Sequence, residues 1–141
     1  MKHYILALAA ALLLWNFQCG KDDPEFAGVA FDLGKPFDAQ TGITYTESTG
    51  PLILNLNEII GDSRCPKDAT CVWEGSTEAA FFLKTATHVE TDTLSSNRYS
   101  SWSDSTLFQG YKIKLVGVAP EKMVGVKIPQ ADYRLKLLVT K

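Results

Sequence analysis

The sequence predicts an all-β protein that folds as a single antiparallel β-sandwich, with a small β-barrel as the alternative architecture. Three observations lead to this prediction. Several short segments alternate apolar and polar residues with a period of two. Clusters of Gly, Pro, Ser and Asn separate these segments. After residue 18, no segment shows a sustained apolar period of 3.6 residues. The sandwich is favoured because the strand segments are unequal in length and the loops between them are long.

The predicted strands succeed one another along the chain. An early strand places Leu52, Leu54 and Leu56 on one face, and an apolar run of strand length follows over residues 77–85. A turn or two of helix is expected near residues 58–62. The buried faces predicted for two further strands consist of Tyr111, Ile113 and Leu115, and of Tyr133, Leu135, Leu137 and Val139.

The size and charge of the chain limit its class. With 141 residues, of which 45% are apolar and 21% charged, the chain has room for one globular domain and a short tail. Its formal net charge of −2 leaves no basic patch. Because binding to nucleic acid depends on such a patch, nucleic acid is not an expected partner.

Residues 1–18 differ in composition from the rest of the chain. Lys2 is followed by an apolar run from Tyr4 to Trp15. This run is too short to cross a bilayer, since a spanning helix needs about 20 apolar residues. A basic start and a short apolar run are typical of a signal peptide, which is removed from the mature protein. The alternative is a buried N-terminal helix.

Cys19 lies at the junction between the apolar run and a strongly charged segment. This arrangement resembles that of bacterial lipoproteins, in which the Cys that becomes the N-terminus carries the lipid. The resemblance implies that Cys19 is lipidated and that residues 19–25 form an anchored tether. Residues 26–141 would then form the all-β domain. Two or more acyl chains hold a protein on a membrane stably without a transmembrane helix.

Lys21, Asp22 and Asp23 follow the Cys directly. A Lys followed by two acidic residues at this place is similar to the signal that directs lipoproteins of the Bacteroidota to the outer face of the outer membrane. The resemblance implies an outer-membrane protein that faces the cell surface. Its partner is the membrane itself, to which the lipid anchors the protein. The alternative is the periplasmic face.

Cys65 and Cys71 are the remaining cysteines, with five residues between them. Export would place them in an oxidising compartment, so a disulfide is predicted. A bridge over so short a loop stabilises by roughly 2–3 kcal/mol at most and mainly determines the shape of the loop. A zinc site is the alternative, but it needs four ligands, and His88 is the only His after the signal peptide. No metal and no other cofactor is therefore expected.

Asp62, Ser63 and Arg64 precede the first of these cysteines. A serine hydrolase would need a base beside Ser63, and His88 is the only imidazole after residue 18. The G-x-S-x-G motif of a nucleophile elbow is also missing from the sequence. We therefore expect no catalytic residues, and a hydrolase is only a remote alternative. Asp62 and Ser63 are expected to form a turn in which Arg64 pairs with Asp62 or with another carboxylate.

Trp73 lies two residues after Cys71. In an extended segment, residues 71, 73 and 75 share one face, which would place the indole beside the disulfide, with Gly75 leaving space behind it. A Trp packed on a disulfide is known from immunoglobulin domains, so the predicted sandwich is Ig-like. Trp73 is thus expected to be a structural anchor.

The segment DSRCP-x₄-CVWEG, followed by an apolar strand and closed by DYRLKLLV, resembles a small domain that recurs in secreted and lipid-anchored bacterial proteins. That domain has no established activity. The resemblance spans residues 26–141. It supports the fold and the location of the protein, and it carries no catalytic residues across.

The Ser-rich segment 95–105 contains Arg98, Tyr99 and Trp102. These residue types are typical of binding loops on other sandwiches, so this segment is the candidate partner-binding loop, for a glycan or a protein. The alternative is a hairpin whose aromatic side chains fold back onto the sheet. The predicted function is that of a non-catalytic binding or accessory module. The alternative function is a structural subunit of a larger envelope assembly.

Overall fold

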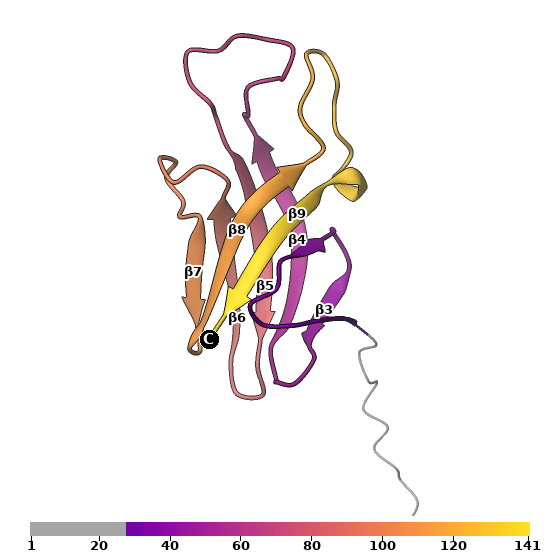
Figure 1. The fold of residues 1–141 in the computed structure, drawn as a ribbon, viewed down its shortest axis with the longest axis vertical. Coiled ribbons are helices and arrows are strands. Elements are labelled where there is room, and N and C mark those ends of the chain that lie inside the picture. Colours follow the sequence, from indigo (N-terminus) through magenta and orange to yellow (C-terminus); the bar gives the residue numbers. More distant parts are fainter. Residues whose placement is uncertain (1–27) are drawn as a thin grey trace, which may run out of the picture.

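The computed structural model describes residues 28–141, which form nine strands and one short 3₁₀ helix (Figure 1). The expected signal peptide, the lipidated Cys19 and the export signal Lys21, Asp22 and Asp23 lie outside the described residues. The elements are β1 (Val29–Phe31), β2 (Phe37–Ala39), β3 (Thr44–Glu47), β4 (Ile53–Asp62), β5 (Thr77–Lys84), β6 (Val89–Ser95), β7 (Ser105–Phe108), β8 (Tyr111–Ala119), η1 (Gln130–Asp132) and β9 (Arg134–Thr140).

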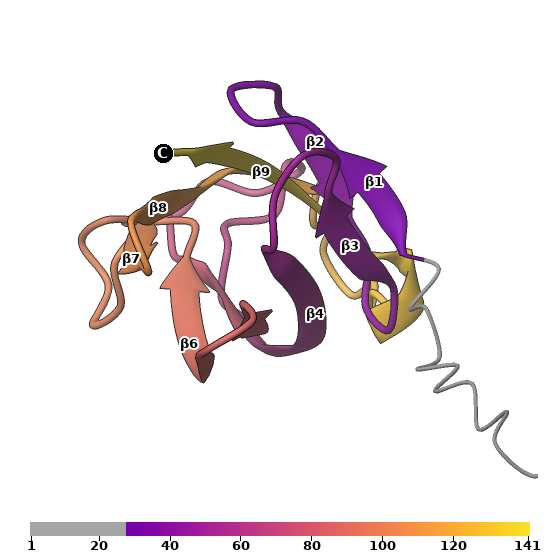
Figure 2. The ribbon, with the colours of Figure 1, turned by 90° about the horizontal axis from the view of Figure 1, so that it is seen from below.

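The strands form two sheets that pack face to face, as Figure 2 shows along the length of the molecule. The first sheet has the order β1-β3-β4-β5-β6 and the second has the order β2-β9-β8-β7. All strand pairs are antiparallel except β1 and β3, which run parallel. The predicted β-sandwich is therefore confirmed, and the barrel alternative is wrong because the two sheets do not close on one another.

The core lies between the sheets, where the alternating apolar residues meet. The predicted inward faces are confirmed, because their side chains are buried in one continuous cluster. These side chains are Leu52, Leu54, Leu56, Tyr111, Ile113, Leu115, Tyr133, Leu135, Leu137 and Val139. Since successive side chains of a strand point to opposite faces, the intervening residues form the outer surfaces of the sandwich.

The helical turn expected near residues 58–62 is wrong, because this segment continues β4. Its backbone pairs with β5 as far as Asp62, which lies opposite Thr77. The register shifts between Leu56 and Glu58 and again between Ile59 and Gly61. Such irregularities place two residues opposite one and interrupt the period of two. The strand pattern in the sequence is lost there for this reason.

Three long loops leave the sandwich at one end. They connect β4 to β5, β6 to β7 and β8 to β9, and the first and last of them extend from the upper end of the molecule in Figure 1. We call residues 63–76, 96–104 and 120–129 together the loop end. The short turns from β5 to β6 and from β7 to β8 lie at the opposite end.

Candidate functional site

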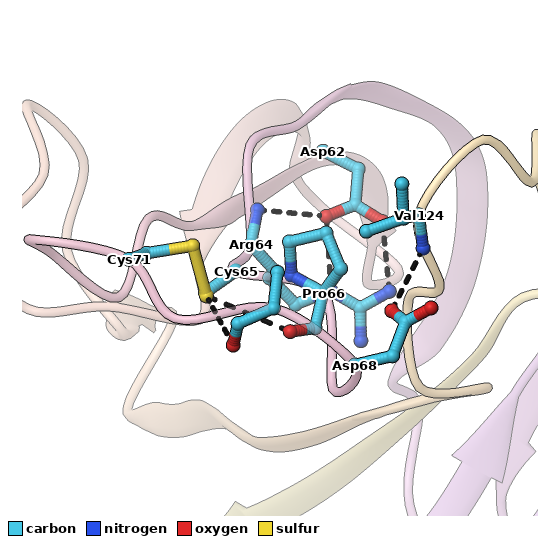
Figure 3. Close-up of a disulfide and its surroundings, with 8 residues drawn as sticks. Asp62, Arg64, Cys65, Pro66, Asp68, Cys71 and Val124 are labelled. Carbon is cyan, nitrogen blue, oxygen red and sulfur yellow. Dashed lines mark hydrogen bonds and ion pairs between the residues drawn. A yellow bond between two sulfur atoms is a disulfide. The ribbon is translucent and has the colours of Figure 1, made fainter.

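The predicted disulfide between Cys65 and Cys71 is confirmed (Figure 3). Their Cα atoms are 5.9 Å apart, within the usual range for a bridge. The two arms of the loop are also paired by backbone hydrogen bonds. The Ser63 amide donates to the Ser76 carbonyl at 2.7 Å, and the Cys65 amide donates to the Glu74 carbonyl at 2.8 Å. These contacts continue the β4–β5 pairing into the loop end.

Arg64 pairs with Asp62, as the sequence predicts. Its Nε donates to Asp62 Oδ1 at 2.9 Å and its Nη2 to Oδ2 at 2.7 Å, while the Arg64 backbone amide donates to Oδ1 at 3.1 Å. Arg64 Nη1 also reaches the carbonyl of Val118, at the end of β8, at 3.2 Å. Both charged side chains are largely shielded from solvent. The pair thus joins the end of β4 to the opposite sheet.

Two further side chains, one of them outside any strand, donate to the same carboxylate. Tyr133, directly before β9, donates its hydroxyl to Asp62 Oδ2 at 2.9 Å. Thr77, the first residue of β5, donates to Oδ1 at 3.3 Å. Sequence analysis missed this role of Tyr133, because the alternation of β9 marks the residue only as a core side chain.

These contacts perturb the ionisation of Asp62. Burial is the largest single influence and raises the pKa, but the hydrogen bonds from Arg64 and Tyr133 and the Arg64 charge outweigh it. Together they hold the pKa of Asp62 at about 2, below its ordinary 3.8. Burial, followed by the hydrogen bond to Asp62, raises the pKa of Tyr133 to about 12. The phenol therefore keeps its proton and remains a donor.

The β8–β9 loop is fastened to the disulfide loop. The Lys67 amide donates to the Lys122 carbonyl at 2.9 Å. The Val124 amide donates to Asp68 Oδ1 at 2.9 Å, as Figure 3 shows. Lys67 also forms an ion pair with Glu121. Two segments more than 50 positions apart in the sequence are thus held side by side.

The β6–β7 loop is fastened to the base of the same disulfide loop. The Ser96 amide donates to the Thr77 carbonyl at 2.9 Å, and Ser96 Oγ accepts from the Thr77 amide at 2.9 Å. Asn97 Nδ2 donates to the Gly75 carbonyl at 3.1 Å. The candidate partner-binding loop and the cysteine loop therefore belong to one surface, although the sequence separates them.

The expected role of Trp73 as a structural anchor is wrong, because this side chain is 72% exposed. Gly75 has a φ of +66°, and a Cβ atom added to it would lie 1.9 Å from the Ser63 carbonyl oxygen. The chain bends at Val72 and Trp73, so the segment from Cys71 is not extended as the prediction assumed. The left-handed Gly75 turns the chain again before β5 begins at Thr77. Gly75 makes room for the facing backbone and not for the indole.

The candidate binding residues Arg98, Tyr99 and Trp102 lie at the surface. Tyr99 is 82% exposed, so its ring does not fold back onto the sheet, and the Arg98 guanidinium lies 5.1 Å from the ring centroid. The loop is ordered by its own polar groups. The Tyr99 amide donates to Asn97 Oδ1, and the Trp102 amide donates to Ser100 Oγ, each at 3.0 Å.

Sequence analysis missed the apolar residues of the β8–β9 loop. Met123, Val124 and Val126 are all exposed there, as is Val72 in the disulfide loop. A signal is present in the sequence, since three apolar residues stand in a segment bounded by Pro120 and Pro129 that has no strand or helix period.

The remaining candidate chemistry is not assembled. Ser63 Oγ donates to the Ser76 carbonyl at 3.1 Å and accepts from the Ser76 amide at 3.0 Å, so it serves the loop backbone. His88 lies in the turn between β5 and β6, at the opposite end of the sandwich. Within residues 28–141, no group of three or more His, Cys, Asp or Glu side chains could hold a metal ion.

The described part of the chain also contains no helix with the length and apolar character needed to cross a membrane. Comparisons of the chain with protein-family models, curated proteins and solved structures find no match.

Replacing Asp62 by Asn is expected to lower the free energy of unfolding by about 3 kcal/mol at pH 7, because the shielded Arg64 charge loses its partner. The native pKa of Asp62 lies below its value in the unfolded chain. Its stabilisation is therefore complete above about pH 4 and is lost as the pH falls through about 2. The free energy of unfolding, measured with urea between pH 7 and pH 2, should fall less steeply toward low pH for Asp62→Asn than for the unaltered protein. Asp38→Asn, at an exposed carboxylate in β2, is the matched control. Equal curves for the two variants would contradict the role of Asp62.

Replacing Gly75 by Ala separates backbone strain from steric overlap. Gly125 has a similar φ of +71°, but a Cβ atom there would meet nothing within 4 Å. Gly125→Ala should lower the free energy of unfolding by only about 1 kcal/mol, the cost of placing a residue with a Cβ atom in the left-handed region. Gly75→Ala should cost at least about 2 kcal/mol more, because the backbone of Ser63 has to move. Thermal and urea unfolding measure both variants, and equal losses would show that the Ser63 contact does not matter.

Proposed function

We propose that this protein is a lipid-anchored envelope lipoprotein that acts as a non-catalytic binding module, and that its loop end contacts a protein partner. One observation carries this proposal. Seven exposed apolar or aromatic side chains gather on three loops that are tied together at one end of the sandwich. They are Val72, Trp73, Tyr99, Trp102, Met123, Val124 and Val126.

The composition of the loop end favours a protein over a glycan. Trp, Tyr and Met are enriched in the centres of protein interfaces, where aromatic residues supply most of the binding energy. Aliphatic side chains such as Val72 and Val124 gain from contact with another apolar surface and offer sugar hydroxyls no hydrogen bonds. Exposed apolar side chains that gather in this way are typical of interaction sites.

The order of the loop end also supports binding. A disulfide and hydrogen bonds in which Asp68 and Ser96 accept and Asn97 donates hold the three loops in one arrangement. A surface that is ordered before binding loses less conformational entropy when a partner arrives. The same surface would serve an accessory subunit that docks on a larger assembly.

The position of the proposed lipid anchor agrees with a loop end that faces away from the membrane. The described residues begin just before β1, which pairs with β3, and β3 lies in the lower half of Figure 1, whereas the disulfide loop extends from the upper end. Cys19 precedes Gly28 by nine residues, a length that could extend to about 30 Å. A lipid on Cys19 would leave the loop end free to meet a partner away from the membrane.

A photoreactive amino acid placed at position 73 or 124 of the full chain should crosslink one and the same protein in cells. Position 107 is the matched control, because Leu107 is 76% exposed but lies on β7, outside the loop end. Crosslinked species are compared by mass spectrometry. The second substitution Trp102→Ser should reduce the yield at positions 73 and 124 by at least tenfold. Equal labelling from position 107, or no discrete partner, would refute the proposed surface.

The anchor and the export signal are tested separately. Cys19→Ser should release the protein from the membrane fraction, because the acyl chains have no other site of attachment. A Lys21/Asp22/Asp23→Ala variant should stay in the membrane fraction but become protected from protease added to intact cells. Immunoblots of both fractions supply the readout. Membrane retention of Cys19→Ser would remove the anchor, and continued protease access in the triple variant would remove surface export.

A further inference from the structure

The outer face of the first sheet carries an open cavity of about 310 Å³, away from the loop end. Three neighbouring strands, β3, β4 and β5, supply its walls. The residues that line it are Thr44, Ile53, Asn55, Asn57, Phe82 and Lys84. The cavity belongs neither to the disulfide loop nor to any residue singled out by the sequence.

Strand register explains how the cavity is built. Thr44 lies opposite Asn55, Asn55 lies opposite Phe82, and Phe82 lies opposite Thr91 of β6. Side chains that face one another across strands point to the same side of the sheet. The half-buried Phe82 ring thus stands in a row of uncharged polar residues. Ile53 lies two residues before Asn55 on β4, opposite Lys84, and therefore on the same face as the Phe82 ring.

The polar groups around the Phe82 ring retain hydrogen-bonding capacity. Asn55 Nδ2 donates to Thr44 Oγ1 at 3.3 Å, which orients the amide and leaves Asn55 Oδ1 as an acceptor. Within residues 28–141, the exposed side-chain amide of Asn57 makes no hydrogen bond. Lys84 Nζ has no carboxylate at ion-pair distance there. The cavity therefore combines an apolar floor with donors and acceptors on its rim.

We propose that this cavity binds a carbohydrate unit of a glycan. A sugar ring has a face of C–H groups and a rim of hydroxyls. The positive C–H groups would lie against the negative face of the Phe82 ring. Asn55 Oδ1 and the Asn57 amide would hydrogen-bond the hydroxyls, and Lys84 would donate to a hydroxyl or to the carboxylate of an acidic sugar. A volume of about 310 Å³ is at the lower end for ligand pockets, which fits one or two sugar units.

Other occupants fit this cavity less well. An acyl chain would cover Asn55, Asn57 and Lys84 without satisfying their polar groups, at a cost for each buried group. An extended peptide could not add a strand here, because β4 and β5 are paired on both sides and offer no free edge. The combination of one aromatic ring with uncharged amides and hydroxyls matches the chemistry of a sugar.

The test uses the full chain in mild detergent and saturation-transfer NMR. The probes are trisaccharides of glucose, galactose, mannose, xylose, N-acetylglucosamine or galacturonic acid, each at millimolar concentration. At least one should bind. Phe82→Leu, which keeps an apolar floor but removes the ring, and Asn57→Ala should each weaken that binding at least tenfold. Lys84→Ala, which removes a proposed donor, should also weaken binding. Its control is Lys112→Ala, at an exposed lysine of the second sheet, and this control variant should leave binding unchanged.

Each other outcome overturns the proposal. It fails if none of the probes binds, if Phe82→Leu and Asn57→Ala bind as the unaltered protein does, or if the cavity retains a fatty acid instead. It also fails if Trp73→Ser abolishes sugar binding while Phe82→Leu does not, because the sugar would then belong to the loop end. Unfolding midpoints check that the variants fold. If Phe82→Leu does not fold, Asn57→Ala decides, because that side chain is exposed.

Discussion

The carboxylate of Asp62 connects the sandwich to its loops. Asp62 is the last residue of β4. Its carboxylate accepts hydrogen bonds from Arg64 in the disulfide loop, Thr77 on β5 and Tyr133 before β9. Arg64 extends the connection to the Val118 carbonyl on β8. The two opposed sheets and the disulfide loop therefore meet at one ionised group. A charge in this position is tolerable only because its partners replace the water that it loses.

The order of the loop end follows from contacts between distant segments more than from the disulfide. The bridge between Cys65 and Cys71 closes a loop within one segment, so its effect is local. Contacts such as Val124 with Asp68 and Asn97 with Gly75 join segments that are far apart in the sequence. They keep exposed apolar side chains in a constant arrangement, which a binding surface needs.

The two candidate surfaces differ because they are built on different backbone. The loop end consists of segments without a strand period, so consecutive apolar residues such as Met123 and Val124 can both face solvent. The cavity lies on paired strands, where alternation places every second side chain outward. Phe82 and Asn55 share that face because their backbones are paired, and this pairing positions their side chains without help from a loop.

The sequence alone determined the features that depend on near neighbours. The alternation around Leu54 and Leu135 predicted the inward faces, since a strand has a period of two in any fold. The pairing of Arg64 with Asp62 and the short Cys bridge were also local. Tertiary structure decided the rest: the disulfide loop bends at Trp73 and leaves its side chain exposed, and three loops meet at one end. These outcomes depend on backbone contacts between distant segments, such as Gly75 against Ser63 and Asn97 against Gly75, for which the sequence has no periodic signal.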